Sequence, residues 1–221
     1  METCKIKNLY NLKETIAADL FEGAEYPWEV LPKIGAFIKE LGSTLSEEEY
    51  EKRGETVWVA KSAKVAPTAF LGENVIIGKN AEVRHCAFIR GNAIVGEGAV
   101  VGNSTELKNV VLFNKVQVPH YNYVGDSILG YRAHMGAGSI TSNVKSDKTL
   151  VVVKEGEDQI PTGLKKFGAM LGDCVEVGCN SVLNPGTVVG RNAQIYPTSC
   201  VRGVIRANSI YKKQGEIVEK R

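Results

Sequence analysis

The chain has 221 residues, of which 27 are Lys or Arg and 25 are Asp or Glu, so its net charge at neutral pH is only +2. This balance does not suggest nucleic acid as a partner, and no apolar run approaches the roughly 20 residues that cross a membrane. The first twelve residues lack the apolar core of a signal peptide, and five cysteines without a C-x-x-C spacing suit a reducing compartment. We therefore expect a cytoplasmic protein with one main domain and a small appendage.

Residues 1–55 carry helix signals and are predicted to form a helical cap, packed on the first coil of the following domain or on a neighbouring subunit. Polar residues that cap helices and a proline suited to a first turn mark the starts. The expected helices are residues 12–22 after the capping box Asn11-x-x-Glu14, residues 28–41 between Pro27 and Gly42, and a short one from Ser46.

From residue 56 onward, aliphatic residues recur every six positions. This period fits neither a helix, with 3.6 residues per turn, nor a strand, with two. It is typical of a hexapeptide-repeat β-helix, in which three repeats make one 18-residue coil and successive coils lie about 4.8 Å apart. The following residue is often glycine, which suits corners with unusual dihedral angles. The repeat positions are Val59, Val65, Leu71, Ile77, Val83, Ile89, Val95, Val101 and Leu107, and later Leu171, Val177, Leu183, Val189, Ile195 and Val201.

The sequence therefore predicts a mainly β protein, a left-handed parallel β-helix of hexapeptide repeats over residues 56–206. Its left hand is what is known of such repeats and does not follow from the spacing. A hairpin or arm is expected in an insertion at residues 144–166, and one strand with a charged end in a tail at 207–221. Such helices commonly pack through flat faces as trimers, so a homotrimer is expected. A sandwich of short strands is the alternative, but nine unbroken repeats disfavour it.

Polar residues gather where the six-residue period slips by one, near residues 110–130. Arg90 and Lys108 lie 18 residues apart and each directly follows a repeat position, so we expect them to stack on one side. Two stacked cations make a phosphate site, and a pair of solvated surface charges is an equally good interpretation of their spacing. His120, in the same region, is a candidate general base or a structural histidine.

Three segments, residues 99–108, 118–126 and 136–143, resemble one domain of a known enzyme family. It is the acyltransferase domain of the bifunctional bacterial N-acetylglucosamine-1-phosphate uridyltransferase/glucosamine-1-phosphate N-acetyltransferase. The match runs from about residue 90 to 143 and resumes at 167–201. Its segments G-N-x-x-E-x-K and H-x-x-Y-x-G-D are specific, whereas the hexapeptides alone are not.

The resemblance implies that an amino-sugar phosphate or sugar nucleotide is N-acetylated by acetyl-CoA as co-substrate, without a metal, at sites between subunits. It gives His120 the role of the base and Glu106 that of orienting it. Arg90 and Lys108 would hold phosphate, Tyr123, His134 and Asn143 would contact the sugar, Lys166 would reach in from a neighbouring subunit, and Ala137, Cys179 and Pro197 would line the CoA groove.

Three positions depart from the family pattern. His134 replaces an asparagine, Cys179 a serine and Pro197 an alanine, so the sugar and CoA contacts there are open. Residues 1–55 are too short for the uridyltransferase domain, so no pyrophosphorylase activity is expected.

Two other functions share this fold. A γ-type carbonic anhydrase binds zinc through three histidines, but His85 and His120 would lie two coils, roughly 9–10 Å, apart, too far for one metal within a subunit. The second is a non-catalytic trimer that binds a sugar nucleotide, which the pairing of His120 with Glu106 disfavours.

Overall fold

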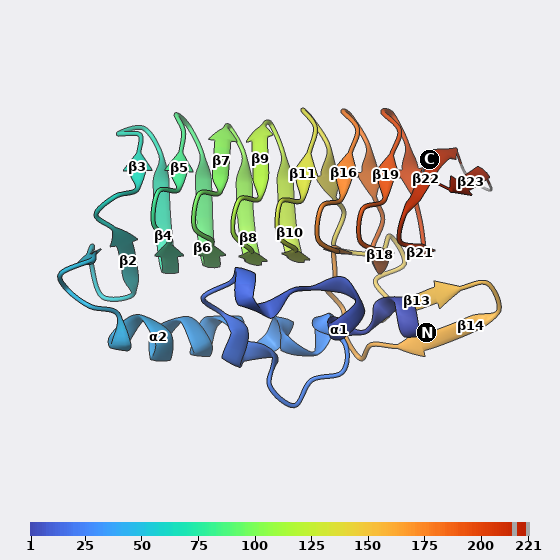
Figure 1. Ribbon diagram of the computed structural model, residues 1–221, viewed down its shortest axis with the longest axis horizontal. Helices are drawn as coiled ribbons and strands as arrows, with labels where there is room; N and C mark the ends of the chain where they lie inside the picture. The colour runs from blue at the N-terminus through green and yellow to red at the C-terminus, as the bar shows by residue number, and fades with distance from the viewer. Residues whose placement is uncertain (214–215, 220–221) are drawn as a thin grey trace.

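The computed structural model describes residues 1–213 and 216–219. From residue 57 the chain winds into a parallel β-helix, and residues 1–44 lie along one side of it rather than at an end (Figure 1). The predicted fold class, a mainly β protein built from hexapeptide repeats with an inserted hairpin, is confirmed. No helix in the described part of the chain is long and apolar enough to span a membrane.

The β-helix has three faces, which we name by what distinguishes them. The short-strand face is a nine-stranded sheet of β3 (Lys64–Val65), β5 (Glu82–Val83), β7 (Val100–Asn103), β9 (Gln117–His120), β11 (His134–Met135), β16 (Glu176–Val177), β19 (Gln194–Ile195), β22 (Ser209–Lys213) and the antiparallel β23 (Glu216–Glu219).

A twelve-stranded sheet forms the other two faces because its long strands bend at a corner. These long strands are β4 (Phe70–Ile77), β6 (Phe88–Val95), β8 (Glu106–Leu112) and β10 (Tyr123–Leu129). Their first halves, continued by β12 (Ile140–Thr141), β17 (Val182–Leu183) and β20 (Cys200–Val201), make the open face. Their second halves, with β1 (Tyr50–Lys52), β2 (Val57–Ala60), β15 (Ala169–Leu171), β18 (Thr187–Val189) and β21 (Val204–Ile205), make the covered face.

The repeat residues fill the interior, as their spacing predicts. Central ones such as Ile89 and Leu107 are fully buried, because each is covered by the equivalent residue of the coils above and below. Val65 and Leu71 are only partly buried. Both belong to the first coil, which has a neighbouring coil on one side only.

The glycines that follow repeat positions are not at the corners with unusual dihedral angles, so that expectation was wrong. Several corners take the left-handed conformation at asparagines, such as Asn92 and Asn109, with φ of 50° and 55°. The glycines are instead needed for close packing between coils. A Cβ on Gly72 would lie 2.2 Å from the carbonyl oxygen of Arg90, and one on Gly102 would lie 1.5 Å from that of Pro119.

Gly102→Ala is therefore expected to destabilise the protein by about 1–3 kcal/mol or more, because a backbone atom of the next coil must move. Arg84 occupies the same corner one coil earlier and carries a long side chain there, paired with Glu82 at 3.1 Å. Arg84→Ala is the control and should cost less than about 1 kcal/mol. Urea unfolding of both variants measures the difference, and equal midpoints would contradict this account of the glycine.

The N-terminal layer differs from the three predicted helices. It consists of 3-10 helices at Glu2–Cys4, Leu12–Glu14, Ala18–Phe21 and Pro27–Lys33, together with α1 (Ile6–Leu9) and α2 (Ile34–Thr44). Packing against the covered face determines these conformations and breaks the expected helix over residues 12–22 into two short turns. Pro32 keeps the start of the second helix in the 3-10 form. From Ser46 the chain makes only a turn before β1.

The prediction that the helix ends at Gly42 was wrong, because Gly42 lies inside α2. A Cβ there would lie 2.5 Å from the ring of Trp58 in β2, so the glycine allows α2 to approach the β-helix. On the side of α2 that contacts the β-helix, Ile34 and Ile38 are fully buried against the covered face. The layer is thus a lateral cover for that face.

The insertion contains the predicted hairpin, β13 (Val152–Glu155) and β14 (Asp158–Pro161), which pair antiparallel. The strand expected in the tail is present as β22, and it turns back into β23. Residues 220–221 of the predicted charged end lie outside the described residues.

Candidate functional site

The corner between the open and the covered face, which we call the Lys108 edge, carries a row of polar residues on successive coils. All residues of this row except Asn143 take the left-handed conformation, with φ of 55° at Asn109 and 47° at Asp126. The row is Asn74, Asn92, Asn109, Asp126 and Asn143, and hydrogen bonds between neighbouring side chains link Asn74 to Asn92, Asn109 to Asp126 and Asp126 to Asn143. Asp126 is the one carboxylate in this row.

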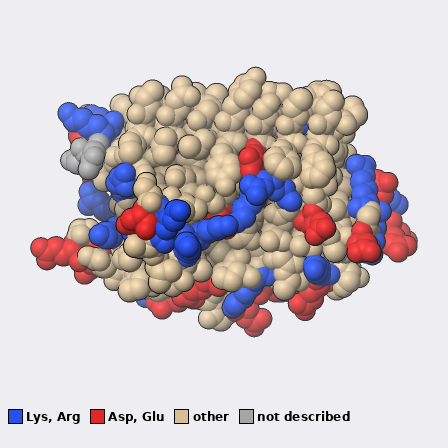
Figure 2. All heavy atoms as spheres, turned by 180° about the vertical axis from the view of Figure 1, so that it is seen from behind, with Lys and Arg blue, Asp and Glu red and all other residues tan. Residues whose placement is uncertain are grey.

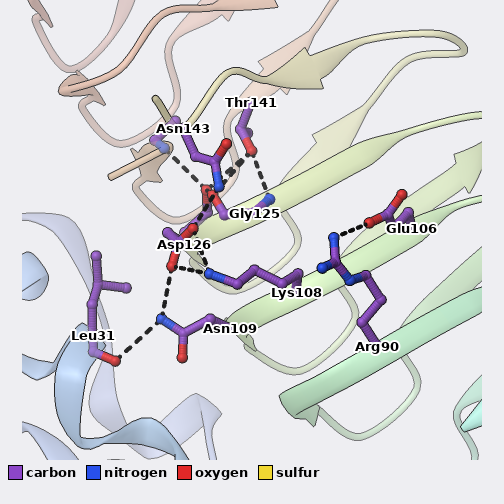
Figure 3. A network of polar contacts seen from close by, with 11 residues as sticks. Leu31, Arg90, Glu106, Lys108, Asn109, Gly125, Asp126, Thr141 and Asn143 are labelled. Atoms are coloured by element: carbon purple, nitrogen blue, oxygen red, sulfur yellow. Dashed lines mark hydrogen bonds and ion pairs between the residues drawn. The ribbon is translucent and has the colours of Figure 1, made fainter. Parts of the chain in front are cut away.

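Asp126 gathers three donors around it (Figure 3). Its carboxylate accepts hydrogen bonds from Lys108 Nζ at 2.8 and 3.0 Å, from Asn109 Nδ2 at 3.1 Å and from Asn143 Nδ2 at 2.5 Å. The Asp126 side chain is only 5% exposed, whereas that of Lys108 is 24% exposed. Asn109 also donates to the carbonyl of Leu31 at 3.2 Å, which ties the N-terminal layer to this network. The ammonium group of Lys108 is thereby held at the surface in a fixed position.

Arg90 does not stack on Lys108, so that prediction was wrong. The register between β6 and β8 shifts here, with Ile89 opposite Leu107 but Gly91 opposite Lys108, and Arg90 is left over as a bulge. Because β4 and β6 keep the 18-residue register on both sides of this point, the one-residue slip lies in β8 directly after Leu107, the last unbroken repeat position. The guanidinium of Arg90 donates to Glu106 at 2.9 Å, which raises the pKa of Arg90.

Tyr123 lies opposite Glu106 on the next coil. Its ring folds over Gly125, where a Cβ would be 2.5 Å from the phenol oxygen and 3.0 Å from Asn143 Nδ2. Burial raises the pKa of the Tyr123 phenol, and the Glu106 carboxylate raises it further. The phenol therefore stays protonated at neutral pH and can donate a hydrogen bond to a ligand.

The corner between the short-strand and the open face, the His120 edge, holds a second set of predicted residues. His120, Ala137, Cys179 and Pro197 follow one another on successive coils, as shown by backbone bonds from Gly138 to His120, Asn180 to Ala137 and Thr198 to Cys179. Both His120 and Cys179 are exposed. The structure thus brings the predicted base and the predicted CoA-groove residues onto one edge.

No hydrogen bond links Glu106 to His120 within the described chain, where Glu106 pairs with Arg90 instead. The expectation that Glu106 orients His120 has no counterpart in these contacts. The reason is that the two residues lie on different parts of the coil. Glu106 is on the open face, opposite Tyr123, whereas His120 is at the corner that comes before this face and lies opposite Asn103.

Two predicted sugar contacts lie apart from Tyr123. His134 is on the short-strand face, where its Nδ1 pairs with Glu176 at 2.8 Å. Lys166 is exposed at the end of the insertion, beside Phe167, whose backbone N–H donates to the carbonyl of Asn143. Lys166 thus adjoins the Lys108 edge, but His134 does not.

The three histidines occupy separate surroundings. His85 bonds Thr68 at 2.9 Å on the His120 edge, two coils before His120, and His134 bonds Glu176. Among the described residues no group of three or more histidine, cysteine or acidic side chains is placed to hold a metal ion.

Sequence reasoning quoted Asp126 and Gly125 in the motif but assigned them no role, and it missed Asn109. A signal for Asp126 and Asn109 exists: Asn74, Asn92, Asn109, Asp126 and Asn143 recur at intervals of 17 or 18 residues. Figure 2 shows the molecule from behind, where a band of basic side chains, with acidic side chains beside it, crosses the face below an upper part that carries few charges.

A scan against models of protein families finds no match. A bifunctional GlmU protein of Methanococcus maripaludis is 34% identical over 200 residues, which cover 89% of this chain and 48% of that protein. A bifunctional sugar-1-phosphate nucleotidylyltransferase/acetyltransferase of Sulfurisphaera tokodaii is 33% identical over 112 residues, 51% of this chain and 28% of that protein. A hexapeptide transferase family protein of Anaplasma phagocytophilum aligns with a TM-score of 0.42 at 18% identity, over 75% of this chain and 80% of that one. The chain thus spans about half, or less, of the length of these two curated relatives. The chain is thus a hexapeptide-repeat β-helix with distant sequence homology to the GlmU proteins over about half of their length.

Proposed function

We propose that the protein is an acetyl-CoA-dependent N-acetyltransferase whose acceptor is an amino sugar carrying a phosphate or a nucleotide. One observation carries this proposal: two sets of side chains flank the open face. The side of the open face at the Lys108 edge presents two separate cations, Lys108 held by Asp126 and Arg90 held by Glu106, and two cations suit a phosphate. The His120 edge presents an exposed imidazole in line with Cys179 and Pro197.

The chemistry assigned to these groups balances without a metal. The neutral amine of the acceptor attacks the thioester carbonyl, and His120 removes one of its protons. The tetrahedral intermediate collapses, the C–S bond breaks and CoA leaves as a thiolate. The thiolate then takes up the amine's proton from the His120 imidazolium. The products are the N-acetylated sugar and free CoA. Lys108 and Arg90 hold the phosphate, so the amine is placed by contacts remote from the reacting bond.

The proposal includes a homotrimer with sites between subunits. Within one chain the two edges are separated by the width of the open face. That face exposes Phe70 and Phe88, whose side chains are 58% and 42% exposed with ring centroids 5.5 Å apart, a patch suited to a second copy. Packing of open faces would bring the His120 edge of one copy to the Lys108 edge of the next. Lys166 would then border a shared site.

Purified protein should release CoA thiol from acetyl-CoA when an amino-sugar phosphate or an amino-sugar nucleotide is added. The matched comparison is unphosphorylated glucosamine, for which kcat/KM should fall by about tenfold or more, since a hydrogen bond to a charged group contributes about 1.5–3 kcal/mol. The measurement is thiol release across a panel of such acceptors. Binding of a sugar nucleotide with no release from any acceptor would favour the non-catalytic trimer and defeat the enzyme.

A further inference from the structure

A hollow of about 700 Å³ lies between the inserted hairpin and the last coils, and it takes no part in the site described above. Its floor is formed by corner residues of the Lys108 edge, and its wall by the hairpin. Ser142, Asn184 and Arg202 each directly follow a paired strand residue, so they occupy one corner position on successive coils. Lys154 and Gln159 face them from β13 and β14.

The hairpin that walls the hollow is firmly docked. Val151 and Val153 are fully buried, and the backbone of β13 lies against two glycine corners. A Cβ on Gly186 would lie 2.9 Å from Val151 Cγ1, and one on Gly203 would lie 2.8 Å from the carbonyl oxygen of Lys154. Both glycines also have positive φ, 84° and 74°. The chain therefore keeps glycine where β13 touches the coils, and the hollow is a built part of the fold.

The hollow carries a net positive charge, and two of its cations form no ion pair with the described residues. Lys145 pairs with Asp147 at 3.3 Å, which neutralises the one carboxylate in the lining. Within residues 1–213 and 216–219, the side chains of Lys154 and Arg202 form no ion pair or hydrogen bond, although both line the hollow. Because a solvated pair of cations repels, their placement on facing walls is best explained by an anion that both contact.

The remaining lining adds two further features of a nucleotide site. The hydroxyl of Ser142 has no partner within the described chain and can donate to a phosphate. Val144, Val152 and Pro185 supply an apolar surface beside the cations, which suits the flat face of a base. A divalent cation is excluded as the ligand by the net positive charge.

From these observations we infer that the hollow between the inserted hairpin and the β17–β20 corners binds a nucleoside phosphate, with Lys154 and Arg202 on the phosphate. Two sources share this chemistry: the adenosine bisphosphate end of CoA and the nucleotide of a sugar nucleotide. The inference rests on the proposed function for the choice of these two sources, while binding itself is measured without turnover.

The experiment measures dissociation constants by calorimetry for CoA, adenosine 3′,5′-bisphosphate and UDP, with the full chain and with the double variant Lys154→Gln/Arg202→Gln. At least one ligand should bind the double variant ten times more weakly or worse, since each lost charged hydrogen bond costs about that factor. The control is Lys148→Gln/Arg206→Gln, which removes two exposed cations that do not line the hollow.

The outcomes separate the sources and the proposals. Loss for CoA and the bisphosphate assigns the hollow to CoA, and loss for UDP alone assigns it to the acceptor nucleotide. Equal weakening by the control variant, unchanged binding in the double variant, or no binding of any ligand to the unaltered protein overturns the inference. Weakened binding in a protein that releases no thiol would support the inference while defeating the proposed transferase.

Discussion

Replacing His120 by alanine is expected to lower kcat for thiol release by about 10²–10⁴-fold, the contribution typical of a positioned general base. The fold should not respond, because the imidazole is exposed and forms no side-chain hydrogen bond within the described chain. Its backbone N–H donates to Asn122 Oδ1 at 3.1 Å and its carbonyl accepts from Gly138 N–H at 3.0 Å, and alanine keeps both bonds. KM for the acceptor should change little, because the phosphate contacts lie on the other edge.

His85→Ala is the matched control, since His85 is an exposed histidine on the same edge, two coils away. It should retain the rate of the unaltered protein. Thiol release under saturating acetyl-CoA gives kcat, and thermal melting checks that both variants fold. Full activity in His120→Ala would remove this histidine from the mechanism, while equal loss in both variants would indicate damage to the edge rather than to the chemistry.

The β-helix could be predicted because one interior side chain recurs in every six residues and nothing else in the chain has that period. Leu107 and Ile89 are buried for the reason that their spacing suggests. Local signals were weaker guides. Gly42 marks a helix end by composition, but its role is to admit the ring of Trp58, a contact between residues 16 positions apart that no local pattern contains.

The site was only partly predictable for a similar reason. A coil of 18 residues predicts that Arg90 and Lys108 stack. The next coil is one residue shorter, so Arg90 is left as a bulge without a partner in β8, and the two cations pair with different carboxylates, Arg90 with Glu106 and Lys108 with Asp126. Spacing locates the corner but not the register across it. The spacing within one chain also cannot predict which residues of two subunits lie together. His120 and Glu106, which lie apart within one chain, are an example.

Asp126→Ala should be among the most damaging substitutions to both stability and binding. Removing the carboxylate leaves Lys108, Asn109 and Asn143 without their shared acceptor. Breaking a buried ion pair costs about 3–5 kcal/mol, and the partial exposure of Lys108 reduces this to about 2–4 kcal/mol. The control is Glu82→Gln, which breaks an exposed pair with Arg84 and should cost less than about 1 kcal/mol. Urea unfolding measures both.

Asp126→Asn separates positioning from stability, because the amide keeps the shape of the side chain but can accept at one oxygen only. Lys108 would then lose its fixed position, and KM for a phosphorylated acceptor should rise by about tenfold while kcat changes less. Lys108→Met should raise KM similarly, and the double variant should be no worse than Lys108→Met alone, since Asp126 acts through that lysine. Additive effects on KM would contradict this coupling and leave Asp126 with a purely structural role at the corner.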